Sequence, residues 1–114
     1  MANRIKILIV DDNNGVANSL KKLLELLNSE VKAAYSGREA IEIINKSFKP
    51  SIAILDIGMP LMDGFQLAEV LKNNNPSIKI IAFTGSNQQQ ESPYFDNYLL
   101  KPVDINILKK VLNL

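Results

Sequence analysis

The chain consists of short, almost wholly apolar segments that alternate with stretches in which apolar residues recur every three or four positions. Four segments are rich in Ile, Val and Leu and a fifth is weaker: residues 5–10, 52–55, 78–83 and 98–100, with the weaker one at 31–35. Near-continuous apolar character is typical of strands covered on both faces. Because parallel neighbours need long crossovers, usually helices, the alternation predicts an α/β fold of five βα units, with a parallel sheet and helices on both faces.

The first two crossovers carry clear helix signals. Apolar residues repeat at helical spacing from Val16 to Leu27, and this helix should end near Asn28. Ser36 and Glu39 have the spacing of a capping box, which predicts the start of a second helix there.

The later crossovers are less uniform. Residues 64–72 have a helical pattern, with Asp63 and Gly64 as the turn that leads into it. Residues 85–97 contain Pro93 and match a helix poorly. Asp104 is suited to cap a last helix. The residues of that helix expected to point inward are Ile105, Leu108 and Leu112.

Length and charge limit what the chain does. Its 114 residues suit a single domain, residues 1–114, with one main site. With 13 Lys and Arg against 12 Asp and Glu, it has no strong field for binding nucleic acid or an anionic membrane. The apolar segments are far shorter than the ~20 residues that span a bilayer. No signal peptide is recognisable after Met1, so a cytoplasmic location is expected.

The chain has no Cys and no His. Disulfides, thiolate or imidazole metal sites, Ser-His-Asp triads and a phosphohistidine are therefore excluded. Any acid, base or nucleophile must be Asp, Glu, Lys, Tyr, Ser or Thr.

Polar residues follow four of the predicted strands. Asp11 and Asp12 follow the first, Asp56 the third, Thr84 the fourth and Lys101 the fifth. In open α/β sheets ligands bind beyond the carboxyl ends of the strands, so these groups should converge. Clustered carboxylates repel one another, and hard oxygen ligands favour Mg²⁺ over zinc. Together with a Lys and a hydroxyl, this composition indicates phosphoryl transfer.

Among the available residue types, only a carboxylate is ionised and nucleophilic at neutral pH without an activating base. Asp56 stands alone on the central strand, whereas Asp11 and Asp12 are adjacent and suit metal binding. The covalent role is therefore assigned to Asp56.

Four motifs together resemble the receiver domain of bacterial two-component response regulators. They are ILIVDDN at residues 7–13, LDIGMPLMDG at residues 55–64, FTG at residues 83–85 and Lys101-Pro102, and they occur in the family's order over nearly the whole chain. The resemblance implies a single flavodoxin-like, doubly wound domain with strand order 2-1-3-4-5.

For the site, the resemblance implies that Asp56 attacks the phosphohistidine of a sensor histidine kinase or phosphotransfer protein and becomes an aspartyl phosphate. Mg²⁺ is then held by Asp11, Asp12, Asp56 and the main-chain carbonyl of Gly58. Lys101 pairs with the phosphoryl oxygens.

The resemblance also implies a switch that signals the modification. Thr84 is drawn toward the phosphoryl group and Tyr98 turns inward behind it, changing the surface that a downstream output protein or domain contacts. The expected protein is a signalling domain, not an enzyme: it phosphorylates itself from the donor, loses the group slowly, and is a monomer or weak dimer. The alternative for Tyr98 is a purely structural role, because aromatic residues in strands commonly do no more than pack against their neighbours.

The interval from Thr84 to Lys101 departs from the family pattern. It is shorter than usual by about one helical turn, so the fourth helix is expected to be shortened. Receiver domains often dimerise or contact their output domains through this region. Because the interval is short in this chain, the resemblance does not imply either contact here.

Two other functions remain open from the sequence. A Mg²⁺-dependent phosphatase also uses an aspartyl nucleophile, but it needs a capping domain and a general acid, for which 114 residues leave little room. A constitutive interaction module would keep the fold without being phosphorylated.

Overall fold

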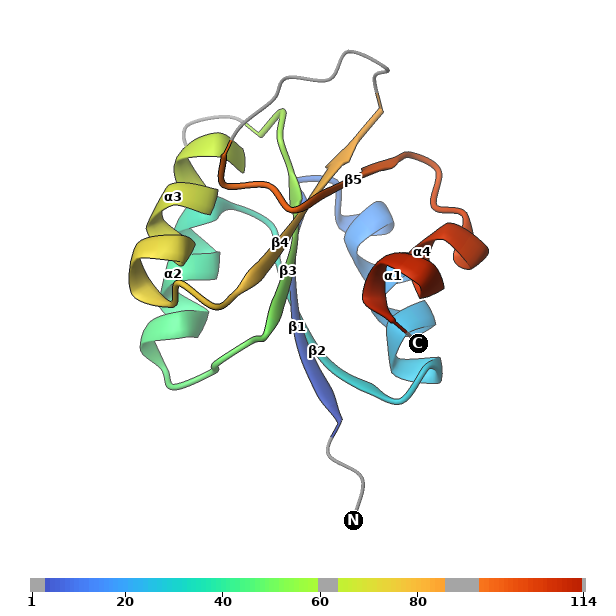
Figure 1. Cartoon of the computed structure of the whole chain (residues 1–114), viewed down its shortest axis with the longest axis horizontal. Coiled ribbons are helices and arrows are strands. Elements are labelled where there is room, and N and C mark those ends of the chain that lie inside the picture. Colours follow the sequence, from blue (N-terminus) through green and yellow to red (C-terminus); the bar gives the residue numbers. More distant parts are fainter. Residues whose placement is uncertain (1–3, 60–63, 86–92, 114) are drawn as a thin grey trace.

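A computed structural model of the chain describes residues 4–59, 64–85 and 93–113 (Figure 1). It contains one parallel sheet in the order β2-β1-β3-β4-β5, which confirms the predicted fold class and strand order. The strands are β1 (Ile5–Val10), β2 (Ser29–Ala34), β3 (Ile52–Asp56), β4 (Lys79–Thr84) and β5 (Asn97–Leu100).

Helices cover both faces of the sheet (Figure 1). On one face lie α1 (Asn14–Leu26) and α4 (Ile105–Leu112), and on the other lie α2 (Gly37–Asn45) and α3 (Gly64–Asn74). No helix in the described part of the chain is long and apolar enough to cross a bilayer.

Two cores explain why the strands are apolar at almost every position. Ile7, Ile9 and Ile54 belong to the core under α1 and α4. Leu8, between Ile7 and Ile9, and Leu55, directly after Ile54, belong to the core under α2 and α3. All five are at most 1% exposed, because successive strand side chains point to opposite faces and both faces are covered.

The predicted N-caps of α2 and α4 are confirmed. Ser36 Oγ accepts a hydrogen bond from the Glu39 amide at 3.1 Å, and the Glu39 carboxylate accepts one from the Tyr35 amide. Asp104 Oδ1 accepts bonds from the amides of the second and third residues of α4, at 2.8 and 3.2 Å. At the end of α1, Asn28 has φ 63°, the left-handed conformation that commonly follows a helix, as expected from its position.

One inward residue was predicted wrongly. Leu108 and Leu112 of α4 are buried, but Ile105 is 39% exposed. Ile105 is the first residue of α4, directly after the Asp104 cap, and the face of the helix that is buried carries Leu108 and Leu112.

The connection from β4 to β5 is not helical at Gly85 or at residues 93–96; the rest of the predicted shortened helix, residues 86–92, lies outside the described residues. Asp96 joins this connection to its neighbours. Its amide donates to the Ile80 carbonyl at 2.7 Å, and its carboxylate accepts from the Ile80 amide at 2.8 Å and from Lys72 Nζ at 3.1 Å. These bonds place the start of β5 beside β4.

Candidate functional site

Three carboxylates meet at the carboxyl edge of the sheet. Asp11 and Asp12 follow β1, and Asp56 is the last residue of the neighbouring strand β3. One oxygen of each lies within 4.8 Å of the others. Paired parallel strands end at the same edge, so the predicted convergence of these three residues is confirmed.

Asp11 is the buried member of the cluster, with only 1% exposure. Its amide donates to the Ala34 carbonyl at 3.1 Å, and its Oδ1 accepts from the Asn13 amide at 2.9 Å. Its Oδ2 lies 2.7 Å from Lys101 Nζ as a contact ion pair but has no partner of normal hydrogen-bond geometry among the described residues. This buried oxygen depends on a cation for compensation.

Lys101 brings its ammonium group to the acidic cluster from the end of β5. Its amide donates to the Thr84 carbonyl at 2.8 Å, and its Nζ lies 3.5 Å from Asp56 Oδ2 and 5.3 Å from the centre of the Phe83 ring. Burial alone lowers the pKa of Lys101, but the close contact with Asp11 and the negative charges of Asp56 and Asp11 outweigh it and raise the pKa above its ordinary value. The lysine is therefore held in its charged form.

The two oxygens of Asp56 have different surroundings. Oδ1 accepts a hydrogen bond from the Gly58 amide at 3.0 Å, which orients the carboxylate. Oδ2 faces Lys101 Nζ. The side chain remains 13% exposed, so it is accessible from solvent whereas Asp11 is not.

Thr84 and Tyr98 lie on β4 and β5. Thr84 is half-buried at the end of β4, opposite Leu100, and therefore at the same edge as the carboxylates. Tyr98 is half-buried farther back, with its ring edge-on to Phe95 at 5.7 Å between centroids. Their predicted switching roles stay predictions.

Sequence reasoning missed two residues that shape the site. Phe83 was named only as a strand residue and as part of the FTG motif, with no role of its own in the site, but its ring lies under the Lys101 ammonium, where the face of an aromatic ring attracts a cation. Gly64 was read as part of the turn into a helix that begins there, and it is indeed the first residue of α3, but its burial was not predicted. Asp63, the other residue of that predicted turn, lies outside the described residues.

The donor set fits a hard divalent cation. The ligand atoms offered by Asp11, Asp12 and Asp56 are all carboxylate oxygens, and they lie close enough to share one ion. The negative charge on the buried Asp11 Oδ2 is balanced by the Lys101 ammonium group, and an oxygen that needs a cation in this way suits a metal.

The chain matches the family model described as the response regulator receiver domain over residues 7–113. Curated relatives include the response regulators MprA of Mycolicibacterium vanbaalenii and Mycobacterium ulcerans, each 32% identical over 103 residues. These alignments cover 86% of this chain and 44% of each relative, so the chain spans less than half the length of these relatives.

Solved structures show the same architecture. A CheY-like response regulator receiver domain from Methylobacillus flagellatus is 27% identical, with a TM-score of 0.89 and coverage of 97% of this chain and 98% of that one. A CheY-like receiver domain protein from Methanospirillum hungatei is 32% identical, with a TM-score of 0.86 over 97% and 93% of the two chains. The chain belongs to the response regulator receiver domain family.

Proposed function

We propose that the chain acts as a phosphoacceptor in a two-component phosphorelay, with Asp56 as the acceptor. The observation that carries this proposal is the meeting of Asp56 with two further carboxylates and the Lys101 ammonium at one edge of the sheet. The family is one of signalling domains and not of classical enzymes. We take residues 1–114 as a single domain of this kind.

In the proposed reaction, a carboxylate oxygen of Asp56 attacks the phosphorus atom of a phosphohistidine. A P–O bond forms, the P–N bond breaks, and its electron pair returns to the imidazole of the donor. The Gly58 amide orients the attacking carboxylate, and Lys101, whose Nζ lies 3.5 Å from Asp56 Oδ2, is the proposed partner of the phosphoryl oxygens.

Asp11, Asp12, Asp56 and the Gly58 carbonyl are the proposed ligands of Mg²⁺, which supplies positive charge for the transferring phosphoryl group. Among divalent cations Mg²⁺ suits this site because its donors are oxygens and it readily shares its shell with phosphate. In this arrangement the charge of the buried Asp11 carboxylate is balanced by Lys101 or by the metal.

The chemical test is incubation with acetyl phosphate and Mg²⁺ followed by intact-protein mass spectrometry. One phosphoryl group per chain is expected. Absence of an adduct would favour an interaction module that is never phosphorylated. Multiple-turnover release of phosphate from small phosphoesters would instead favour the phosphatase reaction.

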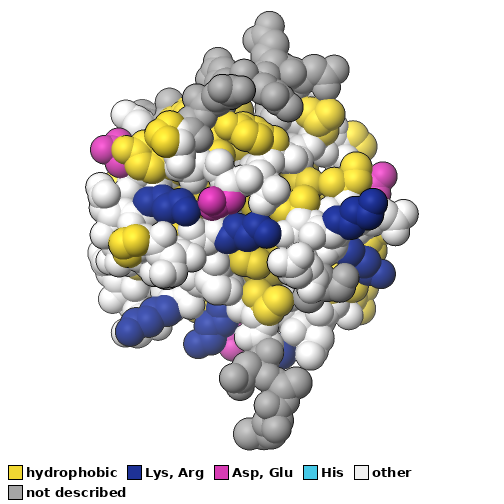
Figure 2. All heavy atoms as spheres, in the orientation of Figure 1, with side chains coloured by type: hydrophobic (Ala, Val, Ile, Leu, Met, Phe, Trp, Pro, Cys, Tyr) yellow, Lys and Arg dark blue, Asp and Glu magenta, His cyan; other side chains and the backbone are white. Residues whose placement is uncertain are grey.

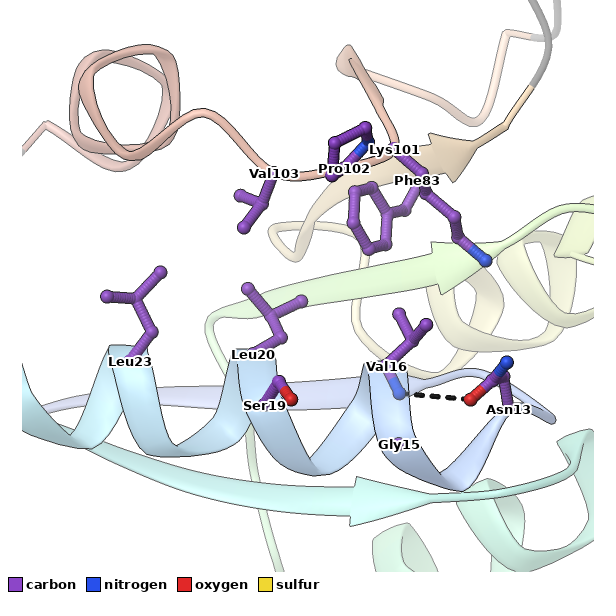
Figure 3. A pocket seen from close by; sticks show the side chains of 10 residues that line it. All are labelled: Asn13, Gly15, Val16, Ser19, Leu20, Leu23, Phe83, Lys101, Pro102 and Val103. Atoms are coloured by element: carbon purple, nitrogen blue, oxygen red, sulfur yellow. Dashed lines mark hydrogen bonds between the residues drawn. The ribbon is translucent and has the colours of Figure 1, made fainter.

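An apolar groove of about 770 Å³ leads away from this site (Figure 3). Val16, Leu20 and Leu23 of α1 line one side, and Phe83, Pro102 and Val103 line the other. Asn13 and Lys101 stand at one end, where Lys101 contacts the acidic cluster. We propose that a helix of the phosphohistidine donor lies in this groove, because the groove continues into the acceptor site.

Val16→Glu tests this docking surface. The phosphoryl donor is a phosphohistidine-loaded kinase domain that phosphorylates the unmodified chain. A charge in the groove is expected to slow this transfer by at least about tenfold, which is typical of the loss of an apolar anchor residue at an interface. Acetyl phosphate needs no docking surface, so phosphorylation by it should change by less than about twofold. Both rates are measured by mass spectrometry.

The matched control is Leu26→Glu, since Leu26 is on the same helix, is 84% exposed and does not line the groove. It should transfer at the unmodified rate. Equal transfer to Val16→Glu and the unmodified chain would rule out docking along this groove.

Mg²⁺ is expected to raise the melting temperature, because a ligand that binds only the folded state stabilises it. At about ten times its dissociation constant the gain is about 1.4 kcal/mol, or roughly 5–10 °C for a small domain. Asp12→Asn removes one proposed ligand charge and should reduce this rise to less than about half. Differential scanning calorimetry in EDTA and in Mg²⁺ measures both.

The control for Asp12→Asn is Glu25→Gln, an exposed acid on α1 that is not part of the cluster. Its melting temperature should respond to Mg²⁺ like that of the unmodified chain. An unmodified chain whose melting temperature is the same in EDTA and in millimolar Mg²⁺ would contradict the metal assignment.

A further inference from the structure

Gly64, the first residue of α3, is packed directly against the backbone of the phosphoacceptor strand. A Cβ added at this position would stand 2.7 Å from Ile57 Cα, 2.8 Å from the Asp56 carbonyl oxygen and 3.1 Å from Ile57 Cγ2. The first two distances are shorter than real Cβ contacts allow, and both involve backbone atoms. Any side chain at position 64 therefore forces backbone to move.

Space, and not backbone conformation, requires glycine here. None of the glycines in the described ranges has a positive φ, so an alanine could adopt the conformation of Gly64. Other glycines near the site are less confined. A Cβ at Gly58 would lie 3.8 Å from Asp56 Oδ1, and one at Gly85 would meet no described atom within 4 Å.

The direction of the movement follows from what holds each segment. Asp56 is paired with Phe83 of β4, and the preceding Leu55 is fully buried, so the end of β3 resists displacement. The residues free to yield are Ile57 and Gly58, together with the first turn of α3. Displacing Gly58 alters its hydrogen bond to Asp56 Oδ1, which orients the acceptor carboxylate.

We infer that Gly64 is a positioning residue for the phosphoacceptor site. Its missing side chain lets α3 press against Asp56 and Ile57 and so sets the place of the Asp56 carboxylate and of the Gly58 carbonyl. This inference rests on the proposed function for its chemical consequence. Its structural part, that the position of α3 determines the position of the Ile57–Gly58 backbone, can be tested separately.

Gly64→Ala is the direct test, with Leu71→Ala as the control for simple loss of stability. Leu71 is buried on the same helix, two turns away from the site. Both variants should melt at lower temperature. Mg²⁺ affinity is measured by calorimetry at a temperature where both variants are folded. Gly64→Ala should bind Mg²⁺ about tenfold more weakly than the unmodified chain, because a metal ligand loses the structure that supports it. The Mg²⁺ affinity of Leu71→Ala should be within about twofold of that of the unmodified chain.

Amide NMR spectra in EDTA provide the second readout. In Gly64→Ala the signals of Ile57 and Gly58 should shift more than those of β2, whereas in Leu71→Ala they should stay in place. Because these spectra need neither metal nor phosphate, they test the inference even if the unmodified chain takes up no phosphoryl group. That last result would count against the proposed function alone.

Phe65→Ala serves if Gly64→Ala does not fold. Phe65 follows Gly64 in the first turn of α3, and its ring packs on Phe95 at 5.1 Å. Its removal loosens the same turn without adding an atom near Asp56, and should shift the same amide signals. Unmoved Ile57 and Gly58 amides in the folded variants, or equal loss of Mg²⁺ affinity in Leu71→Ala, would overturn the inference.

Discussion

Asp56→Asn is expected to reduce phosphorylation by acetyl phosphate at least about 10³-fold, to below detection by mass spectrometry. The neutral amide lacks the charged oxygen that is proposed to attack phosphorus. The variant should fold, since the change removes one of three mutually repelling carboxylates. Its melting temperature in EDTA should therefore equal or exceed that of the unmodified chain.

The matched control is Asp104→Asn. Asp104 caps α4 and lies outside the acidic cluster, and asparagine caps helices about as well as aspartate. This variant should be phosphorylated like the unmodified chain. A full adduct on Asp56→Asn would show that another residue is the acceptor.

Lys101→Met is expected to destabilise the metal-free protein by about 2 kcal/mol, because it leaves the buried Asp11 carboxylate without its cation. For a domain of this size that lowers the melting temperature by roughly 8 °C. Methionine keeps much of the length of the lysine stem, so the effect reports charge more than packing. Calorimetry in EDTA measures it.

Mg²⁺ should recover much of this loss. The metal takes over compensation of Asp11 and Asp56, and no ammonium group competes with it, so the rise in melting temperature with Mg²⁺ should be larger in Lys101→Met than in the unmodified chain. Lys110→Met, on the exposed side of α4, should behave like the unmodified chain in both conditions. Identical melting of Lys101→Met and the unmodified chain in EDTA would show that the Lys101–Asp11 pair carries no stability.

The central strands were predictable because their surroundings leave few alternatives. Residues 7–10 and 52–55 are apolar throughout, as strand segments buried on both faces must be, and the predicted strands at 5–10 and 52–55 correspond closely to β1 and β3. The edge strand β2 begins at Ser29, two residues before the apolar pattern suggests. An edge strand extends by hydrogen bonding to its neighbour, here Ile5 beside Ser29, and such pairing leaves little trace in hydrophobicity.

The acidic cluster was predictable from the resemblance to receiver domains, because the strand order that it implies puts the first strand beside the third. Asp11 follows β1 and Asp56 ends β3, so their meeting needs no knowledge of side-chain positions. The pairing of Lys101 with Asp11 at 2.7 Å, closer than with Asp56 at 3.5 Å, was not predictable. That preference depends on how deeply each carboxylate is buried, which is settled only in the packed structure.

The role of Gly64 was hidden for a related reason. Locally, a glycine after Asp63 has the appearance of a turn, and only the approach of α3 to Ile57 shows that a side chain would not fit. The exposure of Ile105 also depends on tertiary geometry, since a capped helix presents its first residue in a direction set by how the helix meets the sheet.

The most direct test of the phosphoacceptor proposal is to locate the modified residue chemically. The chain is treated with acetyl phosphate and Mg²⁺, the acyl phosphate is reduced with borohydride, and peptides are sequenced by mass spectrometry. Homoserine at position 56 and at no other aspartate is the predicted result, and it should be lost when EDTA replaces Mg²⁺. Homoserine at Asp11, Asp12 or any other position, with position 56 unmodified, would contradict the account.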